Sequence, residues 1–246
     1  MDFTPLWEWF RWLNGATGIK LTILYDSFDR HRFFDGFLTS VRLQAVCLVL
    51  SVAVGVVGAW LQGSRVRLVR LAVQGYIQFF RNTPPLVQLY FFYFALGYYL
   101  SYATDEGLTV ALVSNFAWAV ICLSLYAGAF NVEIFRAGIE AVPKGHVEAA
   151  WSLGLTRWQT FRLIVFPQAV RTVLPPLGND FVAMIKDSAL VSALGVQDIT
   201  QLGKVYSAST FLFFETYNVV AFLYLVMTLS LSLLVRGLER RLKRRE

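Results

Sequence analysis

Four long stretches of the chain contain no Asp, Glu, Lys or Arg, and they limit the classes of fold that are open to it. They cover residues 43–64, 82–104, 107–132 and 216–235. The hydrocarbon core of a bilayer is about 30 Å thick and is crossed by roughly 20 apolar helical residues, so each stretch can span it. Only 15% of all residues are charged, against roughly 25% in soluble domains. The sequence therefore predicts an all-α integral membrane protein.

A fifth apolar segment, residues 167–195, differs from the others because it carries prolines and polar residues. These are Pro175, Pro176, Asn179, Asp180, Lys186 and Asp187. Since such side chains are costly to expose to lipid, this helix is expected to face protein or water. Prolines lack the backbone N–H donor, so we expect Pro175-Pro176 to break the helix near mid-membrane. The sequence thus predicts a transmembrane domain over 36–240, with spans at about 40–63, 84–104, 108–132, 167–195 and 215–236.

The distribution of basic residues predicts the orientation. Fifteen of the 22 Lys and Arg residues lie in three segments: Arg65, Arg67, Arg70 and Arg81; Arg136, Lys144, Arg157, Arg162 and Arg171; and Arg236, Arg240, Arg241, Lys243, Arg244 and Arg245. Cytoplasmic loops carry the excess of Lys and Arg, so we expect the N-terminus outside and the C-terminus, with a basic tail over 237–246, in the cytoplasm. The loops that contain Asp105, Glu106 and Asp198 then lie outside. Because orientation accounts for the positive charge, we expect no nucleic-acid partner.

The first 35 residues contain no apolar run long enough to cross the bilayer, but they are rich in aromatic side chains mixed with charged ones. The relevant residues are Trp7, Trp9, Phe10, Arg11, Trp12 and Lys20. This mixture is typical of a helix at the membrane interface. The alternative is a partly ordered tail that packs on the helix bundle.

Several kinds of chemistry are excluded by the residue types. Cys47 and Cys122 lie in apolar stretches without a CxxC partner, and His31 and His146 have no second ligand one helical turn away, so we expect no metal and no cofactor in this chain. No lysine is followed by Ser or Thr, which rules out a P-loop and hence ATP hydrolysis by this chain alone. GxSxG and HExxH are absent as well, so we do not expect an enzyme.

The predicted cytoplasmic loop over 140–166 has the pattern of two short helices joined by a turn. Residues 146–153 can form two helical turns in which Ala149 and Ala150 add little bulk. Gly154 suits a left-handed helix end, and Thr156 with Gln159 three residues later forms the T-x-x-Q pattern of a capping box. A rigid helix pair at the membrane face is suited to transmit motion to another protein. The alternative is an interfacial loop whose Trp151, Leu155 and Trp158 lie among lipid headgroups.

At these residues the chain resembles the membrane permease subunits of ATP-binding-cassette importers, in their polar amino acid branch. The match to the EAA loop of that family comprises Glu148-Ala149-Ala150, then Gly154, Ile164 and Pro167, with Phe166 where the family has Leu. Further matching segments are Arg81-Asn82-Thr83-Pro84, Leu86-Val87-Gln88-Leu89, Glu133 to Ile139, Val142 to Gly145, Leu174 to Asn179 and Lys186-Asp187-Ser188. The resemblance runs from about Phe34 to the C-terminus and leaves the first 33 residues uncovered.

The resemblance implies a type I importer permease fold and a division of labour. Two permease subunits, either two copies or a copy and a sister chain, form the pathway in the inner membrane. Two ATP-binding subunits with ATP and magnesium lie beneath, and an external binding protein delivers a polar amino acid. The residues implied to dock on the ATPase, as a coupling helix, are Glu148, Ala149, Ala150, Trp151, Leu153, Gly154 and Leu155.

Ionisable residues inside a span are candidates for the substrate pathway, because they are costly to bury. Asp180 could meet the ammonium group of an amino acid, and Asn179 or a nearby helix end could meet its carboxylate. The prolines 175 and 176, with Lys186 and Asp187, complete this candidate pathway. The alternative is that Lys186 pairs with Asp180 or Asp187 to hold the helix in place. Arg81 and Glu133, at two span ends, are interpreted as a helix pair or part of an inner gate.

Two other classes of function compete with an ATP-driven importer. An ion-coupled secondary transporter or channel would need no ATPase partner, but five spans without a visible repeat are few for an alternating-access carrier. A membrane-embedded enzyme would show turnover in the isolated chain.

Overall fold

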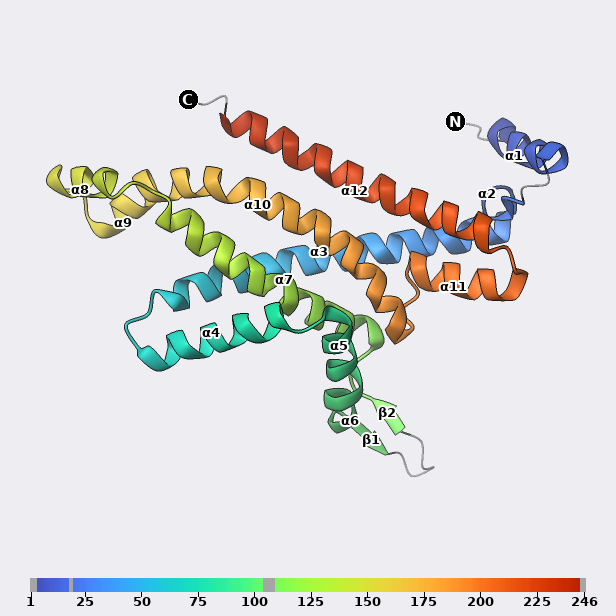
Figure 1. The fold of residues 1–246 in the computed structure, drawn as a ribbon, viewed down its shortest axis with the longest axis horizontal. Helices are drawn as coiled ribbons and strands as arrows, with labels where there is room; N and C mark the ends of the chain where they lie inside the picture. Colours follow the sequence, from blue (N-terminus) through green and yellow to red (C-terminus); the bar gives the residue numbers. More distant parts are fainter. Residues whose placement is uncertain (1–3, 18–19, 104–108, 244–246) are drawn as a thin grey trace.

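The computed structural model describes residues 4–17, 20–103 and 109–243, almost all in helices (Figure 1). A short helical segment, α1 (Thr4–Thr17) and α2 (Thr22–Tyr25), precedes the main bundle. The bundle contains α3 (Ser27–Gln62), α4 (Arg67–Asn82), α7 (Asn115–Glu140), α10 (Phe166–Asp187), α11 (Ile199–Thr210) and α12 (Phe213–Lys243). Asp105 and Glu106 and the last three residues of the basic tail lie outside the described residues.

The packing of α3 against α7 forms the centre of the bundle, and α10 packs on both α7 and α12. Glycines allow these helices to approach closely. A Cβ on Gly58 of α3 would overlap Val132 of α7, and a Cβ on Gly178 of α10 would overlap Val235 of α12. Membrane helices associate through such small residues because lipid provides no hydrophobic drive for helix pairing.

Three helices in the described part of the chain are long and apolar enough to cross a membrane: Ser27–Gln62, Asn115–Glu140 and Phe213–Arg241. The predicted segment 84–104 is divided instead. It contains α5 (Pro85–Tyr90), a π-helical turn η1 (Phe91–Leu96), α6 (Gly97–Tyr99) and the strand β1 (Ser101–Ala103). β1 pairs antiparallel with β2 (Thr109–Ala111), so the helix expected from 108 begins at Asn115.

The segment that follows α3 corrects the sequence interpretation, because most of the expected loop over Arg67 to Arg81 is the helix α4. Its buried residues, Val73, Ile77 and Phe80, recur at helical spacing and face the bundle. Arginines and glutamines on its other side hid this pattern from a search for charge-free runs. The chain leaves α4 at Thr83, which is extended as expected before Pro84, and α5 departs in a new direction (Figure 1).

The helix α10 provides a second correction, since Pro175 and Pro176 lie inside it without breaking it. A membrane helix can retain internal prolines when its neighbours hold it in place. On either side of the prolines α10 is tightly packed: Val173 lies against Gly138 of α7, and Gly178 against Val235 of α12.

Cys47 and Cys122 are free thiols buried in the main apolar cluster, together with Leu43, Trp118 and Leu123. Their interpretation as small buried apolar residues is confirmed. At the N-terminal end the Thr22 hydroxyl forms a hydrogen bond with the Tyr206 hydroxyl, which ties α2 to α11. The side chains of Trp9 and Trp12 on α1 are exposed.

Candidate functional site: the helix pair α8–α9 and the polar cleft

Two short helices, α8 (Lys144–Ser152) and α9 (Arg157–Thr160), form one tip of the molecule, at the far end of α7 and α10 (Figure 1). We call residues 144–160 the α8–α9 tip. It contains every residue of the predicted coupling helix.

The end of α8 is fixed by backbone hydrogen bonds around a left-handed glycine. Gly154 has φ of 81°. The amide of Leu155 donates to the carbonyl of Ala150 at 3.1 Å, and the amide of Gly154 donates to that of Trp151 at 2.9 Å. This pair of bonds is a Schellman motif, in which glycine is favoured because it carries no Cβ. The predicted role of Gly154 in ending the helix is confirmed.

The start of α9 is fixed by the predicted capping box, which is confirmed. The Gln159 amide donates to the Thr156 hydroxyl at 3.3 Å, and the Thr156 amide donates to the Gln159 side-chain oxygen at 2.8 Å. Only Gly154 and Leu155 lie between Leu153, the C-cap of α8, and Thr156, the N-cap of α9. The turn between the two helices is therefore set by local hydrogen bonds at both ends.

The α8–α9 tip is also joined to α10. His146 Nδ1 lies 3.0 Å from the side-chain oxygen of Gln168, whose amide nitrogen donates to the Ile164 carbonyl at 2.8 Å. Ala150 is only 4% exposed, whereas Glu148 and Ala149 are exposed. The His146–Gln168 contact thus links α8 to the first turn of α10, and α8 also packs on α9 and on the turn that follows it.

Several large apolar side chains on the tip are exposed. Trp151 is 52% exposed, Leu153 80% and Trp158 68%, while Leu155 is half-buried. An apolar patch of this kind on a membrane protein marks contact with a protein partner or with the lipid interface.

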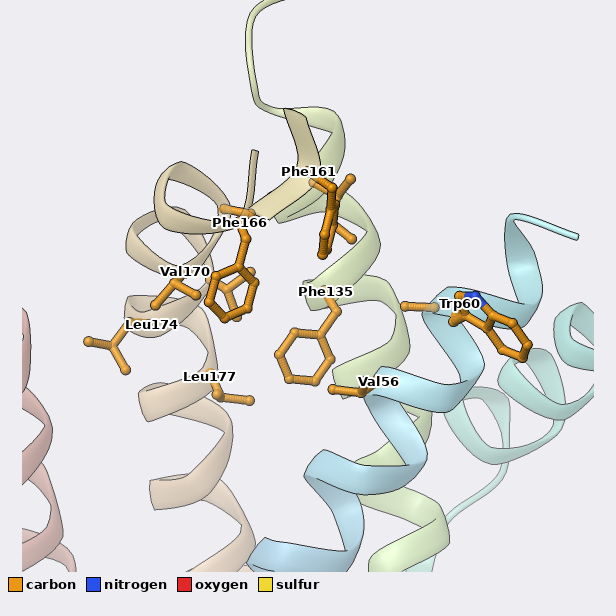
Figure 2. Close-up of a pocket in the computed structure, with 12 residues that line it drawn as sticks. Val56, Trp60, Phe135, Phe161, Phe166, Val170, Leu174 and Leu177 are labelled. Carbon is orange, nitrogen blue, oxygen red and sulfur yellow. The ribbon is translucent and has the colours of Figure 1, made fainter. Parts of the chain in front are cut away.

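An apolar groove of about 440 Å³ lies among α3, α7, α10 and the turn that precedes α10. A π-helical turn, η2 (Phe161–Val165), joins α9 to α10. Phe161 and Phe166, at the two ends of this turn, reach over the groove toward Phe135 of α7, with Val56 and Trp60 of α3 opposite (Figure 2).

A polar cleft of similar size, about 440 Å³, lies between the middle of α4 and the C-terminal parts of α3 and α7. Its lining residues are Gln62, Arg70, Gln74, Ile77, Gln78, Glu133 and Arg136. Glu133 accepts a hydrogen bond from Arg136 at 2.8 Å and another from Gln62 at 3.3 Å, and Arg136 also pairs with Glu140 at 2.7 Å. The cleft thus holds carboxylate, guanidinium and amide groups together.

The structure separates several of the predicted pathway residues from this cleft. Asn179 and Lys186 are exposed on α10, and Asp187 is half-buried. Asp180 has a buried Oδ2 atom that finds no hydrogen-bond partner in the described part of the chain. Lys186 forms no salt bridge with Asp180 or Asp187 in the described part of the chain.

The predicted pair of Arg81 and Glu133 has different partners. The Arg81 guanidinium lies over the Phe130 ring, 5.3 Å from its centroid, and Glu133 pairs with Arg136. Sequence reasoning missed Gln74 and Gln78 altogether. The pattern that could have identified them is a polar residue at every fourth position, in a segment expected to be a loop.

In the described residues no group of three or more His, Cys, Asp or Glu side chains is placed to hold a metal ion.

Residues 52–244 match the family described as "binding-protein-dependent transport system inner membrane component". The chain belongs to this family. A probable glutamine ABC transporter permease protein of Bacillus subtilis, GlnM, is 34% identical over 92% of this chain and 99% of its own length. The histidine/lysine/arginine/ornithine transport system permease protein HisQ of Salmonella typhimurium is 35% identical over 84% of this chain and 91% of its own.

Solved structures agree with this assignment. A chain in a crystal structure of an amino acid ABC transporter with histidines has a TM-score of 0.76 and 35% identity, over 86% of this chain and 94% of that one. A chain of the MetNI methionine ABC transporter has a TM-score of 0.71 at 17% identity, covering 88% and 99%, which shows the shared fold. This binding-protein-dependent family member is thus a permease subunit of the inner membrane, and an ion-coupled secondary transporter or channel is not favoured.

Proposed function

We propose that this permease subunit imports a polar amino acid, with a separate ATPase that binds ATP and magnesium and an external protein that delivers the solute. The names of the relatives support this class of solute, since they include glutamine and histidine/lysine/arginine/ornithine systems. The second permease is another copy of this chain or a sister chain, because a single bundle encloses too little space for a pathway.

The observation that carries the coupling role is the construction of the α8–α9 tip. It is rigid, because Gly154 and the capping box fix the turn, and it presents exposed Trp151 and Leu153 beyond the bundle. We infer that Glu148 to Leu155 dock in a groove of the ATPase. Movement of the ATPase then reaches α10 through the contact of His146 with Gln168.

We propose a matching orientation in the membrane. The tip and the basic tail of α12 face the cytoplasm, and the N-terminus lies outside. The five crossings are α3, the α4–α5 segment, α7, α10 and α12. The exposed Trp9 and Trp12 of α1 then lie in the outer interface of the bilayer.

Asp180 is proposed to meet the ammonium group of the solute during passage, with Asn179 beside it and Lys186 and Asp187 farther out. Its buried Oδ2 has no hydrogen-bond partner among the residues that the structure describes, and a buried carboxylate oxygen of this kind gains most from a cationic group. Pro175 and Pro176 lie one turn before this position on the same helix.

The first experiment is affinity purification of the tagged chain from its native membrane, with identification of the proteins that copurify. We expect a P-loop ATPase with the wild-type chain and its loss with Gly154→Asp, because a non-glycine residue is strained at a positive φ. Gly237→Asp makes the same change at an exposed glycine outside the tip, where no side chain would be met, and should retain the ATPase.

A chain that is recovered alone, and that moves solute in vesicles without ATP, would overturn the proposal. Recovery of the ATPase with Gly154→Asp at the wild-type level would overturn the docking role of the tip. Uptake of competing labelled amino acids by the reconstituted complex then identifies the solute.

A further inference from the structure

The helix α4 is strongly amphipathic. Polar side chains recur every three or four residues along one face, and the apolar residues Val73 and Ile77 are buried beside them. The members of this polar face are Arg67, Arg70, Gln74, Gln78 and Arg81. Leu68 and Phe79 are exposed on the opposite side of the helix. The helix therefore has one face for the bundle, one polar face and one apolar face.

Contacts with α7 show how deep α4 lies. The Tyr76 hydroxyl donates to the Leu125 carbonyl at 2.5 Å, and Arg81 lies over Phe130. Leu125 is fifteen residues before the end of α7 at Glu140, which is roughly 22 Å along a helix. Because α7 can span the membrane, the second half of α4 lies beside the middle of a spanning helix.

Polar side chains beside the middle of a membrane-spanning helix, unlike those of a solvated loop, can be exposed to lipid. Gln74, Gln78 and Arg81 are exposed in the single chain. An arginine placed against lipid near the centre of a spanning helix is costly, and intramembrane polar residues face the bundle interior or a water-filled cavity. The polar face of α4 must therefore be turned to water or protein.

Across the polar cleft α4 meets complementary groups. Glu133 and Arg136 of α7 and Gln62 of α3 line the opposite side. An amino acid carries a carboxylate and an ammonium group, and a guanidinium fork with a nearby carboxylate matches both. Arg70 Nη1 donates to the Ser64 carbonyl at 2.8 Å and to the Arg65 carbonyl at 3.5 Å, and these bonds do not use the Nη2 donors.

We propose that the polar face of α4 and Glu133 form an amino-acid binding site on the inner half of the transport route, between Asp180 and the cytoplasm. This rests on the proposed function of the chain as an importer permease. Arg70 receives the solute carboxylate, and Glu133, which is paired with Arg136 in this structure, receives the ammonium group. The amides of Gln74 and Gln78 line the way between them.

The test is cysteine accessibility in membrane vesicles that contain the assembled importer, with a charged thiol reagent that reacts only in water. The variants are Gln74→Cys and Gln78→Cys, with Leu68→Cys and Phe79→Cys as controls on the apolar face of the same helix. Phe79 is adjacent to Gln78, so the pair compares two faces at one depth. The native thiols Cys47 and Cys122 are buried and give a low background.

We expect labelling at positions 74 and 78, slowed at least severalfold by saturating solute, and little labelling at 68 and 79. Equal labelling of both faces, or none at 74 and 78, would overturn the site. So would an oxidative disulfide between the Gln78→Cys residues of two copies, because the face would then be an interface between subunits.

A transport measurement separates this site from the proposed function itself. Gln78→Leu, which keeps the size of the side chain, should raise the KM for uptake severalfold while the ATPase still copurifies. Phe79→Leu should leave the KM unchanged. Absence of ATP-driven uptake by the wild-type complex would refute the importer assignment. Normal uptake with an unchanged KM for Gln78→Leu would refute the site alone.

Discussion

Tyr224 of α12 donates its hydroxyl to the carboxylate of Asp198, at 3.1 Å. The other oxygen of this carboxylate accepts from the amide of Gln201 at 2.8 Å and so caps the N-terminus of α11. Asp198 is only 1% exposed. One buried carboxylate thus fixes the start of α11 and ties it to α12.

Burial raises the pKa of Asp198, and hydrogen bonds from Gln201, Thr200 and Tyr224 offset part of this effect. A raised pKa in the folded state means that the protonated form is favoured by folding. The contribution of Asp198 to the stability of the fold is complete below the unfolded pKa, about 3.9. It is lost as the pH rises through the pKa of the folded state. We expect the Tm of the wild type, relative to Asp198→Asn, to fall as the pH rises from about 4 to 7. The same pH profile in both proteins would contradict this.

Asp198→Ala should be less stable than Asp198→Asn at every pH. Asparagine can still cap the N-terminus of α11, whereas alanine cannot. Loss of an N-cap costs about 1 kcal/mol of stability. Thermal unfolding of the two variants in the same detergent makes the comparison.

Gly58→Val should prevent α3 from packing on α7, because any Cβ at this position overlaps Val132. Overpacking of this kind costs about 1–3 kcal/mol. We expect a lower yield of folded protein by size-exclusion chromatography and partial rescue by Val132→Ala. Gly75→Val on α4 is the control, because a Cβ at this position has no other atom within 4 Å. Equal yields for the two valine variants would argue against the close approach.

Thr156→Ala removes the side-chain acceptor of the capping box and should destabilise the turn by about 1 kcal/mol. The chain should still insert and bind the ATPase, with less solute moved per ATP hydrolysed. Ser152→Ala removes a hydroxyl that donates within α8, to the Glu148 carbonyl at 3.0 Å, and should leave this ratio unchanged. The ratio is measured in vesicles; if the threonine variant matched the serine variant, a rigid turn would not be needed for coupling.

Tyr76→Phe removes the hydrogen bond between α4 and the Leu125 carbonyl. An average intramolecular bond contributes about 0.5–1.5 kcal/mol, so we expect a modest loss of thermal stability. The reagent accessibility at position 78 should rise as well, since α4 is less firmly held. A variant with unchanged stability would show that the packing of Val73 and Ile77 alone positions α4.

The parts of the candidate site that depend on neighbouring residues were predictable from the sequence. The α8–α9 tip ends at Gly154 and restarts at Thr156 because a left-handed glycine and a capping box act within a few residues. Charge-free runs likewise located the long helices around 43–64, 107–132 and 216–235, since the bilayer requires apolar length.

The tertiary structure decided what these local signals leave open. Pro175 and Pro176 stay helical because α7 and α12 pack tightly on α10 at Val173 and Gly178. The segment 67–82 is a helix whose buried Val73 and Ile77 pack with Val132 of α7, and a search for charge-free runs misses it because of its polar groups. Gln74 and Glu133 are far apart in sequence, so only the packing of α4 on α7 brings them to one cleft.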